Sequence, residues 1–175
     1  ASFVEATENM MRDFPQVDFQ GFDIRNVLQY FVQKKNNQLL SVFDLGGNGQ
    51  FMERLMEEGV SPYLKKAYSL DENVLSVMDL SVRQDEFGRS RYPTVKTKVD
   101  LRFLPEFTAQ LDEKNTFDLI VMNAPYTDGG AIDEYAEEAN NLISEEGVVF
   151  VRLHHMDELK ISVVRDALSV YGIEY

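Results

Sequence analysis

The sequence predicts an α/β protein in which an open, mostly parallel β-sheet carries helices on both faces. Short apolar runs alternate with amphipathic helical segments from residue 38 to the end of the chain, which is the pattern of strands joined by helices. The run 117–122 is almost continuously apolar, as expected of a strand buried on both faces. With 175 residues, of which 44% are hydrophobic and 27% charged, the chain has the size and balance of one globular domain.

Five strands are expected from these runs. They cover residues 39–45, 67–70, 95–103, 117–122 and 148–153, and the third of them is expected at an edge of the sheet. The chain stops early for this architecture. The last strands of the sheet are therefore expected beyond Tyr175, or the sheet lacks them.

Apolar residues at helical spacing predict the helices that join these strands. The helical sets are Phe51, Met52, Leu55 and Met56; Val74, Leu75, Met78 and Val82; Phe107 and Leu111; Tyr135, Ala136, Ala139, Leu142 and Ile143; and Leu159, Val163, Ala167 and Leu168. Glutamates 137 and 138 fit a solvated helix face, and Gly147 separates that helix from the next strand. Residues 84–94 are polar and are expected to form a loop.

The residues before the first strand also show helical spacing, at Ile24, Val27, Leu28 and Phe31. Residues 1–37 are therefore expected to form an N-terminal helical cap, which could cover a binding cleft. Residues 38–175 are expected to form the core, and the two parts together make a single domain.

The net charge of −13 limits the possible partners. A protein that holds nucleic acid by itself needs a basic face, so the acidity favours a small molecule or a protein as substrate, or a partner that presents a nucleic acid. The one basic segment runs over residues 83–98, and the ordinary interpretation of such a segment is a solvated loop. The chain has no cysteine, no apolar stretch of membrane-spanning length and no signal sequence, which suits a cytoplasmic location.

A glycine-rich turn follows the first expected strand, in the segment Asp44-Leu45-Gly46-Gly47-Asn48-Gly49. Glycine lets a ligand approach the backbone closely, and the helix expected after the turn offers free N–H groups at its start. A plain strand-to-helix turn can use two glycines as well. A dinucleotide fingerprint would need a third glycine where Met52 stands, so NAD and FAD are disfavoured.

The turn resembles the first motif of class I S-adenosylmethionine-dependent methyltransferases, an acid followed by glycines in the pattern D-x-G-x-G-x-G. Asp44 and Gly46 match directly, and Gly47 with Gly49 match the later glycines if the turn is one residue shorter. Asn48 and Gln50 stand where further glycines are usual. The resemblance covers roughly residues 38–155 and implies a Rossmann-like fold with S-adenosyl-L-methionine as cofactor.

Acids after the next two strands extend the resemblance. Asp71 corresponds to the acid that accepts hydrogen bonds from the ribose hydroxyls, although it also suits the cap of a following helix. Asp100 and Leu101 correspond to the segment that meets the adenine of the cofactor.

The segment Asn123-Ala124-Pro125-Tyr126 follows the fourth strand and resembles the Asn-Pro-Pro-Tyr motif of methyltransferases that act on planar nitrogens. In that family the asparagine and a backbone carbonyl accept hydrogen bonds from the acceptor NH₂, and the aromatic residue stacks on the substrate. The resemblance thus implies catalytic roles for Asn123, Pro125 and Tyr126, and a cofactor contact for Asn123. Ala124 departs from the motif, and an ordinary strand-end turn is the alternative.

No metal site is expected. The only two histidines, His154 and His155, are adjacent in sequence, so on a strand they would point to opposite faces.

The resemblance implies a methyltransferase acting on a nitrogen of a nucleic-acid base, a protein side chain or a small molecule. No membrane partner is expected, because no apolar stretch is long enough to span a bilayer. The alternative is a catalytically inactive domain of the same fold that serves as a binding or scaffold partner, which Asn48, Gln50 and Ala124 favour. A nucleotide-dependent oxidoreductase is a weaker third candidate, against which Met52 argues.

Overall fold

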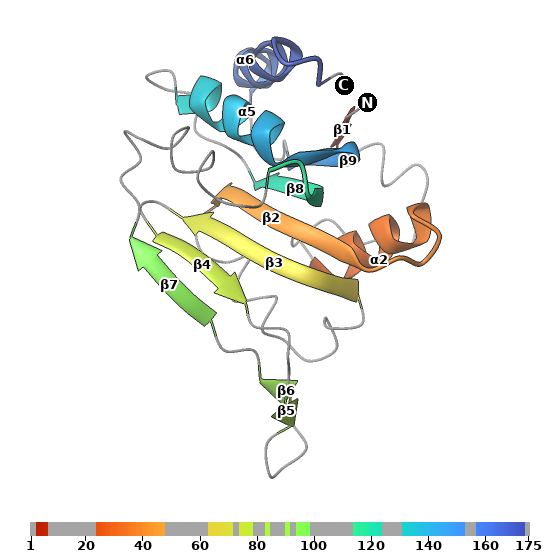
Figure 1. Ribbon diagram of the computed structural model, residues 1–175. Helices are drawn as coiled ribbons and strands as arrows, with labels where there is room; N and C mark the ends of the chain where they lie inside the picture. Colours follow the sequence, from red (N-terminus) through yellow and green to blue (C-terminus); the bar gives the residue numbers. More distant parts are fainter. Residues whose placement is uncertain are drawn as a thin grey trace.

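Figure 1 shows the computed structural model, which describes residues 3–6, 24–47, 63–71, 74–78, 83–84, 90–91, 94–98, 114–123, 131–152 and 157–173. The strands are β1 (Phe3–Ala6), β2 (Leu40–Gly47), β3 (Leu64–Asp71), β4 (Val74–Met78), β5 (Arg83–Gln84), β6 (Ser90–Arg91), β7 (Thr94–Lys98), β8 (Phe117–Asn123) and β9 (Ile143–Arg152). The helices are α2 (Ile24–Lys34), α5 (Ala131–Leu142) and α6 (Glu158–Ser169).

Within the described residues, seven strands form one sheet in the order β1-β9-β8-β2-β3-β4-β7. All pairings from β1 to β3 are parallel, whereas β4 runs antiparallel to both β3 and β7. From β2 the chain moves outward through β3, β4 and β7, and then returns to place β8 on the other side of β2. The strand order therefore reverses between β2 and β8.

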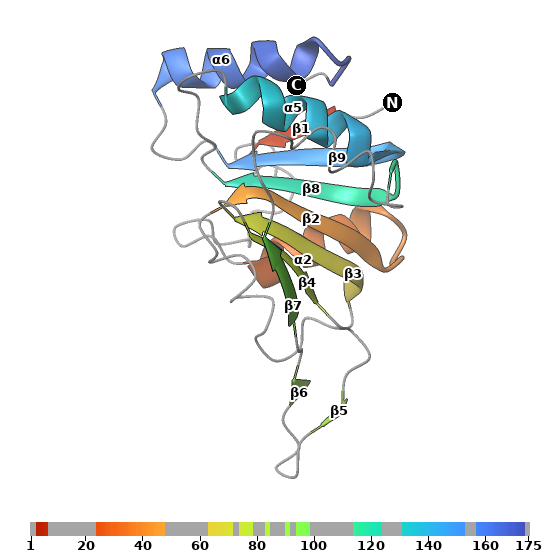
Figure 2. The same ribbon diagram turned by 60° about the vertical axis from the view of Figure 1, so that its left-hand side comes forward.

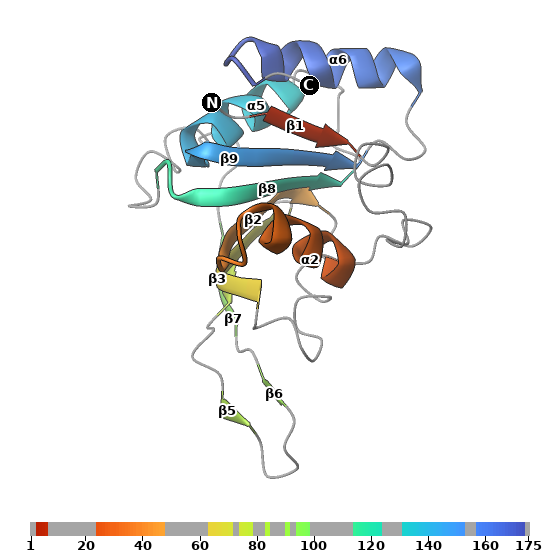
Figure 3. The ribbon, with the colours of Figure 1, turned by 90° about the vertical axis from the view of Figure 1, so that its right-hand side faces the viewer.

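Helices cover both faces of this sheet, and the alternation of side chains along β9 separates the two faces. Val149 and Val151 belong to the hydrophobic core formed with α5 and α6. The ring of Phe150, between them, lies edge-on to Phe31 of α2, with the ring centroids 6.0 Å apart. In Figures 2 and 3, α2 accordingly lies on the opposite side of the sheet from α5. The expected α/β fold, a parallel sheet flanked by helices, is confirmed.

The predicted central strands are confirmed, because residues 40–45, 67–70, 117–122 and 148–152 of the apolar runs lie within β2, β3, β8 and β9. Phe43 and Phe117 pack edge to face across β2 and β8, with ring centroids 5.1 Å apart, and both are fully buried. The fifth predicted strand begins earlier than expected, at Ile143, so Gly147 lies inside β9 rather than before it. The predicted edge strand is confirmed for residues 95–98, which lie in β7 at the end of the sheet order, and residues 99–103 lie outside the described part of the chain.

The predicted helix at Val74, Leu75 and Met78 is wrong, because these residues form β4. β4 pairs antiparallel with β3, from Asp71 opposite Val74 to Ala67 opposite Met78. Five largely apolar residues fit a helix face and a buried strand equally well, and the pairing with β3 decides between them.

The N-terminal part of the chain is not helical throughout. α2 confirms the helix expected around Leu28 and Phe31, but Phe3–Ala6 form a strand that pairs parallel with β9. The expectation of helices alone before residue 38 is therefore wrong for residues 3–6. The expected loop over 84–94 also contains structure, because β5 and β6 pair as a two-stranded ribbon.

Two side chains depart from their expected burial. Glu138 is fully buried on α5, where a solvated position was expected, and Leu159 of α6 is 75% exposed although it was expected on the buried face. Ala167 and Leu168 of the predicted face are buried as expected, and Val164 is buried with them. Among the described helices, none is long and apolar enough to cross a membrane.

Candidate functional site

The carboxyl edge of the parallel strands is the candidate site, because ligands of open α/β sheets bind where the strand order reverses. β2 lies at this reversal, with β3 on one side and β8 on the other. The ends of these three strands are Gly47, Asp71 and Asn123. Parallel neighbours end at the same edge, so three of the predicted site residues are brought together there.

Gly46 and Gly47 close β2, so the strand continues two residues further than its apolar run predicts. Gly47 is the register partner of Asp71, and the register shifts between Leu45 and Gly47. This irregularity places a residue without a Cβ beside the acid at the end of β3. Backbone at such a position is open to close approach by a ligand.

Asp44 lies deeper in the sheet than these glycines. It is fully buried, and its Oδ2 accepts a hydrogen bond of 2.8 Å from the hydroxyl of Ser69. Asp44 and Ser69 are register partners on β2 and β3, and Val121 of β8 is the partner of Asp44 on the other side. The hydrogen bond between Ser69 and Asp44 thus lies within the sheet. A contact between Asp44 and a cofactor stays a prediction.

Asn123 is the last residue of β8, and its register partner on β9 is Arg152. The two strand spacings between the ends of β3 and β8 separate Asp71 from Asn123 by roughly 10 Å. The predicted ribose-binding acid and the predicted acceptor-binding asparagine therefore flank the glycine end of β2, one on each side.

Sequence reasoning missed two residues of this edge. Ser69 stands two positions before Asp71, and no sequence signal indicated its contact with Asp44, because that contact depends on the register of β2 and β3. Arg152 interrupts the apolar run of β9. A basic residue at the end of a buried strand is the sequence signal that could have identified Arg152 as a site residue.

The remaining predicted site residues lie outside the described part of the chain. These are Gly49, Asp100, Leu101, Pro125 and Tyr126, together with the neighbouring Asn48, Ala124, His154 and His155. Within the described ranges, no group of three or more potential ligands could hold a metal ion.

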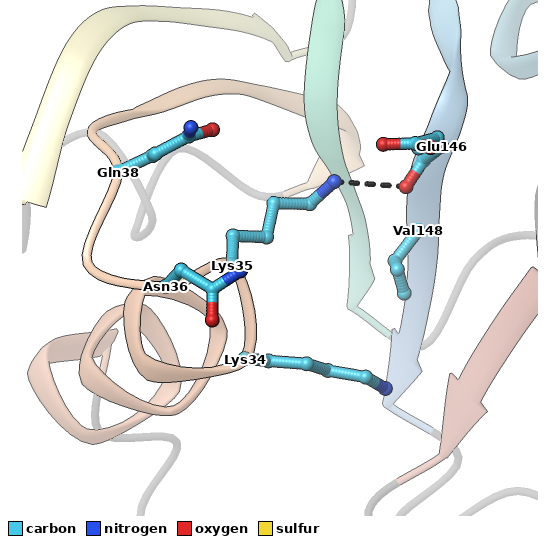
Figure 4. A pocket seen from close by; sticks show the side chains of 6 residues that line it. All are labelled: Lys34, Lys35, Asn36, Gln38, Glu146 and Val148. Atoms are coloured by element: carbon cyan, nitrogen blue, oxygen red, sulfur yellow. Dashed lines mark hydrogen bonds between the residues drawn. The ribbon is translucent and has the colours of Figure 1, made fainter.

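A pocket of about 350 Å³ lies at the opposite edge of the sheet, between the end of α2 and residues Glu146 and Val148 of β9 (Figure 4). Its lining residues are Lys34, Lys35, Asn36, Gln38, Glu146 and Val148. Lys35 Nζ donates a hydrogen bond of 2.8 Å to the carbonyl oxygen of Glu146. Basic side chains at a helix C-terminus interact favourably with its dipole, so the two lysines have a structural explanation.

This pocket does not contain the predicted site, because Val148 pairs with Phe3 and Leu119 near the amino ends of the parallel strands. We therefore assign the candidate site to the carboxyl edge on topology and on the residues that end β2, β3 and β8.

In comparisons with known proteins, no family model, no curated protein and no solved structure matches this chain.

Proposed function

We propose that the chain is a Rossmann-like, S-adenosyl-L-methionine-dependent methyltransferase whose acceptor is a nitrogen atom. The observation that carries the proposal is the reversal of strand order at β2, with Gly46-Gly47, Asp71 and Asn123 at three adjacent strand ends. This is the position at which open α/β sheets bind nucleotide-like ligands.

The residue types at this edge fit a cofactor that combines a nucleoside with a charged amino-acid group. A carboxylate at Asp71 is a suitable acceptor for two ribose hydroxyls, and the glycines of β2 leave room beside it. Arg152 adds a cationic residue at the end of β9, two strands away from the glycines of β2 and in register with Asn123. The cofactor supplies an electrophilic methyl group, and the protein's task is chiefly to position the acceptor.

Asn123 is the residue we assign to the acceptor. Its side-chain amide offers both a hydrogen-bond acceptor and a donor, which suits an NH₂ group attached to a planar carbon. Asn123 ends a strand buried on both faces, and its pairing with Arg152 in the β8–β9 ladder fixes its backbone. Fixed positions of this kind are what a positioning mechanism requires.

Isothermal titration calorimetry with S-adenosylmethionine tests the proposal. The intact chain should bind, and Asp71→Ala should weaken binding at least about tenfold, which corresponds to the loss of one charged hydrogen-bonding partner. Asp133→Ala is the matched control, because Asp133 is an exposed acid on α5. No binding by the intact chain, or equal losses in both variants, would overturn the assignment.

The acceptor role of Asn123 has its own test. Transfer of a labelled methyl group to pooled nucleic acids, peptides or amines should fall by about a hundredfold or more in Asn123→Ala, while cofactor affinity changes little. A variant that keeps full transfer would remove Asn123 from the site.

A non-catalytic role is the second candidate, and the contact between Asp44 and Ser69 favours it. The first acid of the glycine segment is fully buried and hydrogen-bonded within the sheet, so a structural function explains that residue without any ligand. A chain that binds no S-adenosylmethionine and yet folds cooperatively would support this scaffold function.

A further inference from the structure

The pocket between α2 and β9 combines cationic side chains with a size suited to a small ligand. Its volume of about 350 Å³ lies within the range of small-molecule sites. Val148, which lines it, is in register with Phe3 and Leu119 near the amino ends of the parallel strands. The pocket is therefore a second candidate site, at the other end of the strands from the one proposed for methyl transfer.

The wall that β9 contributes is an irregular part of its pairing with β8. Phe117 is in register with Ile143, and Leu119 is in register with Val148, so β9 advances five residues while β8 advances two. Glu146 lies within this irregularity, and its carbonyl oxygen accepts the 2.8 Å hydrogen bond from Lys35 Nζ. Irregular pairing of this kind often re-aims side chains beside a functional site.

Two ammonium groups reach toward this wall from the C-terminal end of α2. Figure 4 shows the side chains of Lys34 and Lys35 both extending from the helix toward β9. Lys34 Nζ lies 5.6 Å from the ring centroid of Tyr30 and 5.9 Å from that of Phe31, and both rings are buried. Lys35 Nζ is held by the carbonyl of Glu146. These contacts fix the positions of both ammonium groups at the pocket.

The helix dipole favours cationic residues at this end of α2, but it does not account for the shared direction of the two side chains. Directing two lysines toward one pocket restricts the rotamers of both and brings like charges together. An anion with two negative charges, bound between the ammonium groups, would offset both costs.

We propose that this pocket binds the phosphate group of a small phosphorylated molecule. A phosphate monoester carries between about 1.5 and 2 negative charges at pH 7 and has three acceptor oxygens, which matches two ammonium groups with three N–H donors each. The carboxamides of Asn36 and Gln38 add further donors to the same lining. A carboxylate has one charge and two oxygens, so it matches these donors less well.

The β9 side of the pocket suits the rest of such a molecule. The carboxylate of Glu146 is a hydrogen-bond acceptor, and the buried side chain of Val148 offers an apolar surface. An acceptor in this place disfavours a second anionic group and favours a hydroxyl group. The ligand class is therefore a small phosphorylated alcohol or sugar. This inference goes beyond methyl transfer and does not depend on it.

A nuclear magnetic resonance titration of the full chain with glycerol 3-phosphate, at constant ionic strength, tests the proposal. Backbone amide signals of residues 34–38 and 146–148 should shift saturably, with a dissociation constant below about 1 mM. Glycerol, which lacks the phosphate, and acetate, which carries a single charge, should bind at least about tenfold more weakly, the equivalent of one charged hydrogen bond.

The Lys34→Gln/Lys35→Gln double variant removes both ammonium groups. It should weaken glycerol 3-phosphate binding at least about tenfold. Lys65→Gln/Lys160→Gln is the matched control, since both lysines are exposed and the change in net charge is the same. The control should bind within about twofold of the unmodified chain, and thermal melting should show that both variants fold.

Glu146→Gln separates a binding role from a structural one. It removes the carboxylate from the pocket and keeps the backbone carbonyl that Lys35 contacts. Removal of a negative charge beside a bound phosphate should tighten binding by about twofold to fivefold. If the lysines served only the helix end, this substitution would leave the affinity unchanged.

The proposal is overturned if glycerol 3-phosphate produces no saturable shifts, or if the shifts lie only at residues away from the pocket. Equal losses in the two double variants would also overturn it, and so would acetate binding as tight as that of glycerol 3-phosphate. The titration contains no S-adenosylmethionine. Its failure would therefore leave the proposed methyl transfer untouched, and a failure of cofactor binding would leave the phosphate site untouched.

Discussion

The hydroxyl of Ser69 donates a 2.8 Å hydrogen bond to Oδ2 of Asp44, and the two residues are register partners on neighbouring parallel strands. Asp44 is fully buried and Ser69 is 2% exposed. Asp44 alternates with Phe43 and Leu45, which face α5 and α6, so the pair lies on the α2 side of the sheet. A buried carboxylate requires donors of this kind, and the pair therefore contributes to the position of β2 relative to β3.

Ser69→Ala should lower the free energy of unfolding by about 1–3 kcal/mol, because it removes a donor from a buried carboxylate. Urea denaturation followed by circular dichroism measures the change. Ser162→Ala is the control, because Ser162 is exposed on α6, and it should change stability by less than about 0.5 kcal/mol. Equal effects of the two substitutions would show that the Asp44 contact contributes nothing.

Gly147→Ala should destabilise the fold by about 1–3 kcal/mol through overpacking. A Cβ at residue 147 would lie 2.5 Å from Cδ1 of Ile143 and 2.9 Å from the carbonyl oxygen of Phe117, and the backbone oxygen cannot move freely. Thermal denaturation measures the effect.

Gly172 is the control for Gly147, because a substitution at Gly172 strains the backbone without steric overlap. Its φ is +73°, and a Cβ there would meet nothing within 4 Å, so Gly172→Ala should cost about 1 kcal/mol from backbone strain alone. Gly172→Asn should recover part of this loss, because asparagine tolerates the left-handed region, whereas Gly147→Asn should recover nothing. Recovery at both positions would mean that steric overlap is not the cause at Gly147.

Lys66→Met should cost about 0.5–1.5 kcal/mol, from one hydrogen bond and one cation–π contact. Lys66 Nζ donates a 2.7 Å hydrogen bond to Oγ1 of Thr116 and lies 4.4 Å from the ring centroid of Phe117. Lys65→Met is the neighbouring control at an exposed position. Chemical denaturation of both variants should show a loss at residue 66 only, and a similar loss at residue 65 would contradict the assignment.

Tyr171 should make the folded state less stable at alkaline pH. Burial, followed by the negative charges of Glu137 and Asp133, raises the pKa of Tyr171 above 10.0. The folded state then holds the phenolic proton more tightly than the unfolded state. This contribution to stability is complete below pH 10.0 and is lost as the pH rises through the folded-state pKa.

Melting temperatures measured on both sides of pH 10 check the effect. Tyr171→Phe should show a smaller decline than the unmodified chain, and Glu137→Gln should lower the pKa of Tyr171 toward its ordinary value. Identical declines in all three proteins would exclude Tyr171 as a source of the alkaline instability.

The central strands of the sheet could be predicted because a strand that is buried on both faces has a continuous run of apolar residues in the sequence. Residues 117–122 are almost all apolar, and a run that short is a strand rather than a helix. The same reasoning fixed the edge at which Gly47, Asp71 and Asn123 meet, because parallel strands that alternate with helices end on one side.

The outer part of the sheet could not be predicted, because it depends on pairing partners distant in the chain. Residues 74–78 become a strand only through their antiparallel register with β3, and residues 3–6 only through their register with β9. A solvated position is expected for Glu138 because it is a charged residue beside Glu137, and only the packing of α5 reveals that it is buried. The contact between Ser69 and Asp44 likewise needs the register of two strands.

The pairing of β1 with β9 also determines the order in which this chain can complete its sheet during synthesis. Residue 3 pairs with residue 148, so the first described strand to leave the ribosome must wait for the last one. Contacts of such high sequence separation carry a large loop-closure entropy and slow folding. Until β1 docks, β9 presents an open edge of backbone donors and acceptors, which makes the incomplete sheet a template for association with other nascent chains.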